Sequence, residues 1–424
     1  MIKFDIKSLE DYDKNYSTAV QSPEQFWSTI AKENFTWKRP WSKVLDWDFS
    51  VPKISWFEGS QLNITENCID RHLELNGNKT AILFEPNNPK DPFEAITYKE
   101  LHKRVNQFAN VLKSKGIEKG DRVCIYLPMI PELAISVLAC ARIGAIHSVV
   151  FAGFSATALS TRINDCDCKM VITSDGGYRG AKTIDLKSIV DTALLDCNGI
   201  QSVLVAKRIH TNIPMVSGRD FWLQPLLDAA SETCEATVMD AEDPLFILYT
   251  SGSTGQPKGM VHTTAGYMVY AGYSFKNIFQ YEADDIYWCT ADIGWITGHT
   301  YIVYGPLLNG ATTVMFEGVP SYPDYGRFWS IVEKHKITQF YTAPTAIRAL
   351  AKERLEFVTP YDLSSLKILG TVGEPINEEA WHWYNDHIGK KKCPIVDTWW
   401  QTETGGIMIS PIPNIFEGKP AFAT

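Results

Sequence analysis

The sequence predicts an α/β fold in which mostly parallel strands alternate with helices. Apolar runs of strand length alternate with helix-length segments, those segments keep helical spacing of apolar residues, and Gly or Pro marks their ends. A chain of 424 residues is long enough for about two or three domains. Its composition, 45% hydrophobic and 21% charged, is typical of a globular protein with a large core.

The alternation becomes clear at Thr97, where Thr97 and Glu100 form a capping box. Helical spacing continues from there to Gly116, which suits a helix end. The next elements expected are a strand over 123–127, a helix over 131–143 that ends at Gly144, and a strand over 146–151. These are consecutive βαβ units, which favour a parallel sheet.

The same pattern returns in the second half of the chain. We expect strands over 245–249, 311–316, 366–369 and 394–398, and a helix that Asn377 caps and Gly389 ends. Residues 1–75 are rich in aromatic side chains without clean periodicity. They are expected to form an irregular N-terminal extension packed on the core, and residues 76–424 form the main domain.

Composition argues against several classes of protein. A net charge of -9 disfavours a nucleic-acid binder. There is no apolar run of about 18 residues for a membrane span and no signal-peptide stretch at the start. Nine scattered cysteines without a C-x-x-C pair disfavour a disulfide framework or a zinc site, and Cys166 and Cys168 are interpreted as ordinary thiols. We therefore expect a cytoplasmic protein of undetermined oligomeric state.

A Ser, Thr and Gly-rich segment follows the strand at 245–249. Between Thr250 and Gly259 lie three glycines, four hydroxyl side chains and one lysine. Glycine lets the backbone approach a polyanion, while N–H groups, hydroxyls and a lysine can bind phosphate. The segment does not match the Walker A pattern, and a flexible surface loop is the alternative. The predicted phosphate-binding residues are Ser251, Gly252, Ser253, Thr254, Gly255 and Lys258.

The segment YTSGSTGQPKG resembles the phosphate loop of the acyl-adenylate-forming superfamily. GTVGEPI and DTWWQTETGG resemble two further nucleotide-site motifs of that superfamily, in the same order. The resemblance implies that Thr250 and Lys258 are catalytic and that Glu403 helps to hold Mg²⁺. It assigns the ATP and AMP site to Gly373, Glu374, Pro375, Asp397, Thr398, Trp399, Trp400, Gln401 and Thr402.

Two longer stretches resemble the AMP-forming acetyl-CoA synthetases within that superfamily. They are ADIGWITGHTYIVYGPLLNGATTVMFEGVP and FAGFSATALSTRINDCDCKMVITSDGGYRGAK. The resemblance implies an acetate pocket made by Ile296, Thr297, Val372 and Trp400. It implies a CoA site made by Arg179, Gly180, Ala181, Lys182, Thr297 and Ser321. Ser321 stands where relatives have Asn, and a Lys replaces a common Arg in the basic segment.

The resemblance also implies a fold, a reaction and a partner set. The fold is the large N-terminal domain of such enzymes, with a partial β-barrel at its C-terminal end. The substrates are acetate, ATP and CoA, with Mg²⁺ as cofactor, and neither nucleic acid nor membrane is a partner. A carboxylate first attacks the α-phosphorus of ATP, and the thiol of CoA then attacks the acyl-adenylate. The chain ends at GKPAFAT, before the small C-terminal domain of relatives. We therefore expect weak nucleotide binding and little or no turnover from it alone.

Three alternatives were weighed against this interpretation. A propionyl-CoA synthetase differs only in pocket size, and a single methylene is worth ~1–3 kcal/mol. A nucleotide-binding domain without catalysis is favoured for the chain by itself. An oxidoreductase is excluded because no G-x-G-x-x-G follows an early strand. Trp399 is predicted to lie by the adenine or to brace the strand end, and Trp400 to close the acyl pocket. His262 and His299 are predicted to pack against other rings.

Overall fold

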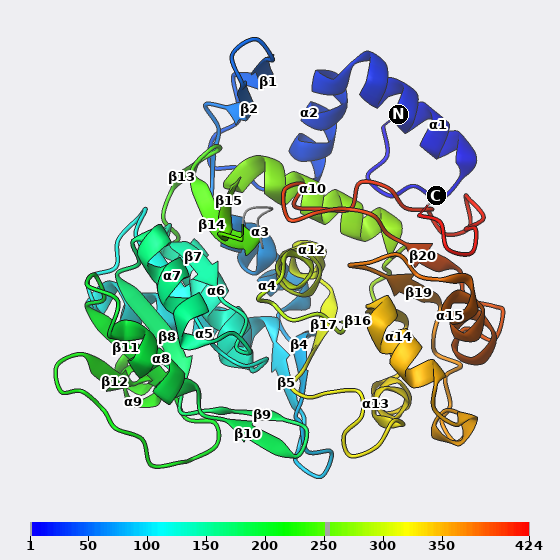
Figure 1. Cartoon of the computed structure of the whole chain (residues 1–424). Coiled ribbons are helices and arrows are strands. Elements are labelled where there is room, and N and C mark those ends of the chain that lie inside the picture. Colours follow the sequence, from blue (N-terminus) through cyan, green and yellow to red (C-terminus); the bar gives the residue numbers. More distant parts are fainter. Residues whose placement is uncertain (1, 251–254, 424) are drawn as a thin grey trace.

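Two sheets with the same plan organise the protein (Figure 1). The computed structural model describes residues 2–250 and 255–423. Over these residues each sheet has seven strands, six of them parallel and one antiparallel at an edge. The first sheet has the order β12 (Asp220–Trp222), β11 (Ser202–Ala206), β8 (Met170–Ser174), β6 (Arg122–Ile125), β7 (Ile146–Val149), β14 (Pro244–Thr250) and β15 (Lys258–Thr263).

The second sheet repeats this arrangement. Its antiparallel edge strand is β5, which pairs with β4. Its order is β20 (Ile395–Asp397), β19 (Ile368–Thr371), β18 (Gln339–Thr342), β16 (Ile286–Cys289), β17 (Thr312–Phe316), β4 (Thr80–Glu85) and β5 (Glu94–Thr97). The expected parallel α/β fold is confirmed in both halves of the chain.

Helices cover both faces of each sheet. One central core contains residues of both sheets and of helices α5 (Tyr98–Ser114), α6 (Pro131–Ile143) and α10 (Thr264–Ile278). Helices α7 (Ala156–Cys166) and α8 (Leu186–Leu194) pack on the outer face of the first sheet. Helices α13 (Arg327–His335), α14 (Pro344–Ala351) and α15 (Glu378–Trp383) pack on the outer face of the second. On β6, Val123 and Ile125 face the central core while Cys124 faces the outer one, as strand alternation requires.

Shorter elements connect these layers. They are β3 (Gln61–Leu62), α3 (Ile64–Cys68), α4 (Leu73–Asn76), β9 (Gly177–Arg179), β10 (Lys182–Ile184), α9 (Leu223–Ala229), β13 (Met239–Asp240), α11 (Ile296–Gly298) and α12 (Gly305–Leu308). Two 3₁₀ turns lie at Asp70–His72 and Leu355–Phe357, and two π-helical segments at His299–Tyr304 and Tyr384–Ile388.

The N-terminal region is more regular than the sequence suggested. It contains helices α1 (Leu9–Gln21) and α2 (Pro23–Asn34) and a hairpin of β1 (Lys43–Asp48) and β2 (Lys53–Glu58). The prediction of an irregular extension was wrong because the many aromatic residues hid local signals. Ser8 caps the first helix by accepting the Asp11 N–H, and Pro23 begins the second. Phe26 and Ile30, one turn apart, both enter the central core.

Local signals in the rest of the chain were more reliable. The Thr97 hydroxyl accepts the Glu100 N–H as predicted, and the helix predicted over 131–143 has those bounds, with Gly144 in the left-handed region at φ 76°. Asn377 precedes α15, but its side chain makes no capping hydrogen bond. That helix continues as the π-helical segment that ends before Gly389.

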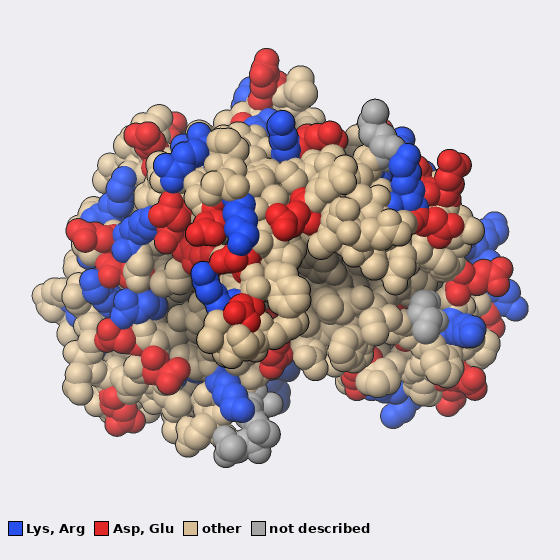
Figure 2. Space-filling view, turned by 90° about the horizontal axis from the view of Figure 1, so that it is seen from above, with Lys and Arg blue, Asp and Glu red and all other residues tan. Residues whose placement is uncertain are grey.

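The C-terminal end differs from the expected partial β-barrel. After β20, the described residues form only an isolated antiparallel bridge between Trp399 and Ile409. Within 2–250 and 255–423, no helix is long and apolar enough to cross a membrane. Figure 2 shows acidic and basic side chains interspersed over the face seen from above.

Candidate active site

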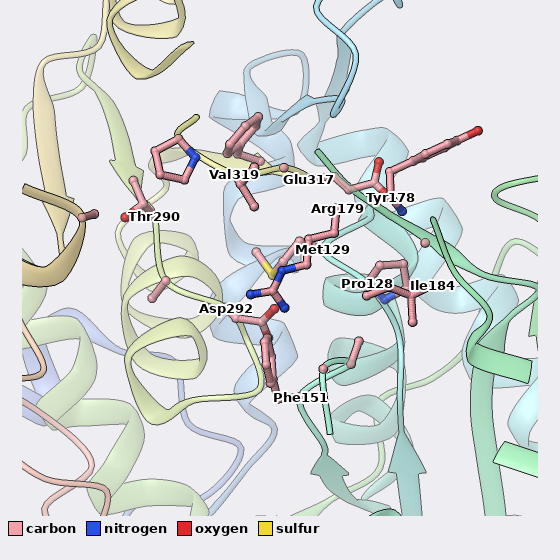
Figure 3. Close-up of a pocket in the computed structure, with 18 of the residues that line it drawn as sticks. Pro128, Met129, Phe151, Tyr178, Arg179, Ile184, Thr290, Asp292, Glu317 and Val319 are labelled. Atoms are coloured by element: carbon pink, nitrogen blue, oxygen red, sulfur yellow. The ribbon is translucent and has the colours of Figure 1, made fainter. Parts of the chain in front are cut away.

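Two adjoining cavities lie where the carboxyl ends of the two sheets face each other. Ligands of open α/β sheets bind at this end of the strands. The inter-sheet cavity has a volume of about 460 Å³ and is lined by residues of both sheets, among them Phe151, Arg179, Asp292, Glu317 and Val319 (Figure 3). The second, here the Trp400 cavity, has a volume of about 480 Å³ and is lined by residues that follow strands of the second sheet.

The Trp400 cavity brings together all four residues predicted for the acetate pocket. Val372 follows β19, Trp400 follows β20, and Ile296 and Thr297 lie on α11. Strands β19 and β20 are parallel neighbours, so the segments after them reach the same edge. Trp295, Gly373, Gln401 and Thr402 complete this part of the wall. The cavity therefore joins the predicted acid pocket to two of the predicted nucleotide-site motifs.

The neighbouring tryptophans have different surroundings. Trp400 is half-buried, and its ring lies edge-on to Tyr301 at 5.1 Å between centroids. The Trp400 Nε1–H donates to the Tyr341 hydroxyl at 3.4 Å. Trp399 is 50% exposed, and its backbone pairs with Ile409. The packed wall of the cavity is thus Trp400, and Trp399 presents its ring to solvent.

A hydroxyl network supports the strand ends behind Trp400. The fully buried Tyr341 hydroxyl lies 2.6 Å from the Thr398 Oγ1, which donates to the Thr371 carbonyl at 2.8 Å. The Thr371 hydroxyl donates to Asp397 at 2.7 Å. Burial raises the pKa of the Asp397 carboxyl, and the bond from Thr371 acts in the opposite direction. Asp397 and Thr398 therefore brace the strand ends, while Gln401 and Thr402 line the cavity.

The predicted phosphate loop connects an antiparallel hairpin. Thr250 at the end of β14 pairs directly with Lys258 at the start of β15. Gly255 has φ 80°, a conformation that few residues other than glycine adopt, and Lys258 is exposed. Ser251, Gly252, Ser253 and Thr254 lie outside the described residues. The two candidate catalytic residues thus stand face to face at the base of the loop.

His262 connects this hairpin to the segment after β20. Its Nε2 donates to the Thr402 carbonyl at 2.7 Å, and burial lowers the pKa of the ring. The ring stacks on Phe246 with centroids 4.8 Å apart. His299 lies against the same phenylalanine at 4.9 Å, and burial lowers its pKa to about 4. The predicted packing roles of both histidines are confirmed, and His262 also links β15 of the first sheet to the segment that follows β20 of the second.

The other nucleotide-site motif follows β19. Gly373 is exposed with φ 96°, a conformation that leaves its backbone accessible. Glu374 is held by an ion pair with Arg348 at 2.7 Å and by the Thr345 hydroxyl. Pro375 is exposed beside it. This loop borders the Trp400 cavity through Val372 and Gly373.

The residues predicted for CoA are divided between the two cavities. Arg179 lines the inter-sheet cavity and pairs across a hairpin with Lys182, with Gly180 and Ala181 in the turn. Gly180 has φ 62°, and its backbone forms two hydrogen bonds with the Asn87 side chain. Thr297 lines the Trp400 cavity instead. Ser321 is exposed and follows Val319 and Pro320, which line the inter-sheet cavity.

The candidate metal ligand is a single carboxylate. Glu403 is exposed beyond Thr402, and the described parts of the chain contain no group of three or more His, Cys, Asp or Glu side chains that could hold a metal. Mg²⁺ usually binds one or two carboxylates together with substrate phosphates and water. Glu403 fits that mode of binding.

Comparison with known families agrees with this geometry. The family model described as AMP-binding enzyme matches residues 69–421. The chain belongs to the AMP-binding enzyme family. A second model, acetyl-coenzyme A synthetase N-terminus, matches residues 12–68.

Curated relatives of the chain are named acetyl-coenzyme A synthetases. "Acetyl-coenzyme A synthetase 2" of Pseudomonas aeruginosa is 56% identical over 415 residues, which are 98% of this chain and 64% of that protein. The "Acetyl-coenzyme A synthetase" of Magnetococcus marinus is 55% identical and that of Leptospira biflexa 57% identical, with the same shares covered. The chain spans 64% of the length of these relatives.

Sequence reasoning missed two residues of the candidate site. Asp292 lines both cavities, and burial raises the pKa of its carboxyl to about 6. An acidic residue three positions after an apolar strand and two positions before a glycine was a visible signal for it. Tyr341 supports Trp400 from β18. No local pattern distinguishes that tyrosine from an ordinary core residue, since its partners are far away in the sequence.

Proposed function

We propose that the protein carrying this chain ligates acetate to CoA with ATP. The carboxylate of acetate displaces pyrophosphate from ATP to give acetyl-adenylate, and the thiol of CoA displaces AMP to give acetyl-CoA. One observation carries the proposal: Ile296, Thr297, Val372 and Trp400 enclose one cavity that borders both the Gly373 loop and Thr402. The names of the curated relatives support it.

Acid selection is proposed to depend on the size of the Trp400 cavity. Ile296 and Val372 are buried apolar residues, and the indole of Trp400 occupies space that a longer acyl chain would need. Selectivity for a two-carbon acid then arises by exclusion of longer acids. The Thr297 hydroxyl is a polar group in the same wall.

The adenylation step brings two anions together, so groups that bind negative charge should dominate it. We propose that the phosphate loop, Ser251 to Gly255 together with Thr250 and Lys258, binds the phosphates of ATP. The loops at Gly373–Pro375 and Asp397–Thr402 are proposed to bind its nucleoside. The hydrogen bond from His262 to Thr402 supports this proposal, since it links the phosphate hairpin to the second of these loops.

Glu403 is the residue proposed to hold Mg²⁺. When bound there with ATP, the ion would neutralise charge on the phosphate oxygens. Arg179 to Lys182, Thr297 and Ser321 are proposed to bind CoA. The lysine at 182 offers a point charge and not the bidentate contact of an arginine.

We further propose a division of the chain into an N-terminal extension at 1–75 and a large domain at 76–424. A reducing, cytoplasmic compartment is also proposed, which the odd number and scattered spacing of the nine cysteines support. A preference for propionate is the nearest alternative reaction. For this chain by itself, nucleotide binding without turnover is the alternative.

Acetate-dependent ATP–pyrophosphate exchange and CoA consumption test the proposal. Both are measured for the natural protein and for residues 1–424, with acids of two to five carbons. We expect acetate to have the highest kcat/KM in the natural protein and little turnover by the chain alone. A higher kcat/KM for propionate, or no acid-dependent exchange, would contradict the proposed reaction. Equal rates for the two proteins would contradict the expected inactivity of the chain.

A further inference from the structure

The two cavities share a short stretch of wall. Four residues line both of them, namely Thr290, Ala291, Asp292 and Ala343. Asp292 is the one titratable residue among these four. It is also the only titratable residue of the described chain that lines the Trp400 cavity. A carboxylate thus stands at the boundary between the cavity proposed for the acyl group and the cavity that contains Arg179.

The loop that carries Asp292 is held firmly on both sides. The Asp292 Oδ1 accepts the Gly294 N–H at 2.7 Å, so one carboxylate oxygen anchors the turn. Ile293 is fully buried, and its N–H points to the Met129 sulfur at 3.3 Å. Gly294 packs on Phe151 so closely that a Cβ would lie 2.9 Å from the Phe151 Cα. The second carboxylate oxygen has no hydrogen bond to another described residue.

Charges around Asp292 come from the opposite side of the inter-sheet cavity. Figure 3 shows the Arg179 side chain pointing toward the Asp292 carboxylate. Burial raises the pKa of Asp292, whereas the Gly294 N–H and the charge of Arg179 lower it, and the result is a pKa of about 6. Glu317 and Tyr178 are the other titratable residues that line this cavity among the described residues, and Glu317 is paired with Arg208. Asp292 is therefore largely ionised at neutral pH and able to take up a proton.

We propose that Asp292 is the general base that accepts the thiol proton of CoA during acyl transfer. In this step the sulfur–carbonyl bond forms, the bond between the carbonyl carbon and the adenylate oxygen breaks, and AMP leaves with that electron pair. The S–H proton passes to the carboxylate of Asp292 and then to solvent. This inference rests on the proposed function.

The placement matches what the chemistry requires. A thiol must lose its proton to become a strong nucleophile, and a base within reach of the reacting atoms contributes about 10²–10⁴-fold. A base whose pKa lies near the working pH can both accept and release the proton. Arg179, from its place in the cavity wall, favours the ionised form of Asp292. The adenylation step involves no proton removal, so it gains nothing from this base.

An Asn substitution distinguishes the two roles of Asp292, as a proton acceptor and as the hydrogen-bond partner of the Gly294 N–H. Asp292→Asn keeps an Oδ1 that accepts the Gly294 N–H but cannot accept the thiol proton. Asp324 provides a matched control, because its Oδ1 accepts the Gly326 N–H at the same distance of 2.7 Å outside both cavities. Asp324→Asn makes the same chemical change in the same kind of turn.

The test uses the natural protein, its Asp292→Asn variant and its Asp324→Asn variant. Acetate-dependent ATP–pyrophosphate exchange reports adenylation, and single-turnover transfer from preformed acetyl-adenylate to CoA reports the second step. For Asp292→Asn we expect exchange close to that of the unsubstituted protein and transfer slower by about 10²-fold or more. In the unsubstituted protein the transfer rate should fall as the pH drops through about 6. This fall should disappear in Asp292→Asn and remain in Asp324→Asn.

Four outcomes would overturn the inference. If Asp292→Asn transfers the acetyl group at the unsubstituted rate, Asp292 is not the general base. The same conclusion follows if the transfer rate of that variant still falls below about pH 6. An equal fall of exchange and transfer would assign Asp292 to the shape of the site. Exchange that is absent even from the unsubstituted protein would overturn the proposed function and this inference together, whereas normal exchange with normal transfer overturns the inference alone.

Discussion

The two sheets share one strand plan, and a buried ion cluster lies beside each of them. The central residue is a carboxylate in one cluster and a lysine in the other. In the second sheet the fully buried Glu85, at the end of β4, accepts from Arg327, Lys334 and His335 on α13. In the first sheet the fully buried Lys187 on α8 pairs with Asp191 at 2.7 Å and Asp220 at 2.9 Å. Both clusters attach a helix to a strand at or beside the edge of a sheet.

Their connections to the hairpin that carries Arg179 make the two clusters different. Asn87 lies two residues after Glu85, and its side chain fixes the backbone of Gly180 beside Arg179. The Lys187 cluster fixes β12, at the edge farthest from the phosphate hairpin. The comparison teaches that equivalent sheets use buried charge for stability in both cases, but only the Glu85 cluster is linked through Asn87 to the Gly180 backbone beside Arg179.

The largest expected effect comes from removing the central charge of each cluster. Glu85→Gln should lower the free energy of unfolding by ~3–5 kcal/mol, because it leaves the buried Arg327 without its partner charge. Lys187→Met should lower it by less, because Arg219 still pairs with Asp191 and Asp220. Denaturant titration measures both. Only Glu85→Gln should also raise the KM for CoA, through Asn87 and Gly180. Equal KM values in the two variants would break the comparison.

Lys336→Met is the control for these variants. It removes an exposed ion pair with Asp362, so the free energy of unfolding should change by less than about 1 kcal/mol. A loss as large as that of the buried clusters would show that burial is not what makes them strong.

Acid should also lower the free energy of unfolding through Glu85, by somewhat less than the Glu85→Gln substitution does. Burial alone would raise the pKa of Glu85, but hydrogen bonds from His335 and Lys334 outweigh it and lower the pKa to about 2. The folded-state pKa is thus below the unfolded value of about 4.3. The stabilisation is present above pH 4.3 or so and is lost as the pH falls toward 2, by up to about 3 kcal/mol.

Denaturant unfolding at pH 5 and pH 3 measures this loss. Glu85→Gln cannot take up the proton at residue 85, so the difference between the two pH values should be smaller in that variant. The same pH dependence with and without the substitution would assign the acid sensitivity to other carboxylates.

Trp400→Gly should change which acids the protein uses, because Trp400 lines a cavity formed by residues that follow strands of the second sheet. The opened cavity should admit longer acids, at ~1–3 kcal/mol of binding per added methylene, and acetate use should fall. Values of kcat/KM for acids of two to five carbons measure the change. Trp399→Gly is the matched control, because that ring is 50% exposed and lies outside the cavity lining. If Trp400→Gly has unchanged kcat/KM values across these acids, Trp400 does not form the acid pocket.

The smallest expected effect concerns the hydroxyl behind Trp400. Tyr341→Phe removes the partner of the Thr398 hydroxyl and of the Trp400 indole, which should cost ~1 kcal/mol of stability and raise the KM for acetate a few-fold. Tyr287→Phe is the control, since its fully buried hydroxyl has no hydrogen-bond partner among the described residues. Equal KM values for acetate in both variants would show that the Tyr341 hydroxyl does not position Trp400.

Elements with strong local signals were predicted well. The helix at 131–143 begins with Pro and ends with Gly, and Thr97 caps its helix as expected, because these signals act within one turn. The first two helices carried similar signals at Ser8 and Pro23 and were nevertheless missed. Asn377 shows the converse case, since a suitable capping residue makes no cap in the folded chain.

Contacts between distant segments could be proposed only by resemblance. Ile296, Val372 and Trp400 lie in three separate segments, and they meet because two parallel strands and a short helix end at one edge. The antiparallel pairing of Thr250 with Lys258 and the link from His262 to Thr402 likewise depend on the assembled sheets. The role suggested for Asp292 required two cavities that no single segment forms.

The order of residues along the chain was enough to establish the α/β class, most element positions and the motifs of the candidate site. Periodicity, caps and turn residues operate over a few neighbouring positions, so they can be read without a partner segment. The shape of the acid cavity, the raised pKa of Asp292 and the different surroundings of Trp399 and Trp400 came from tertiary structure. Burial and long-range hydrogen bonds depend on which surfaces pack together, and that is settled only when the two sheets meet.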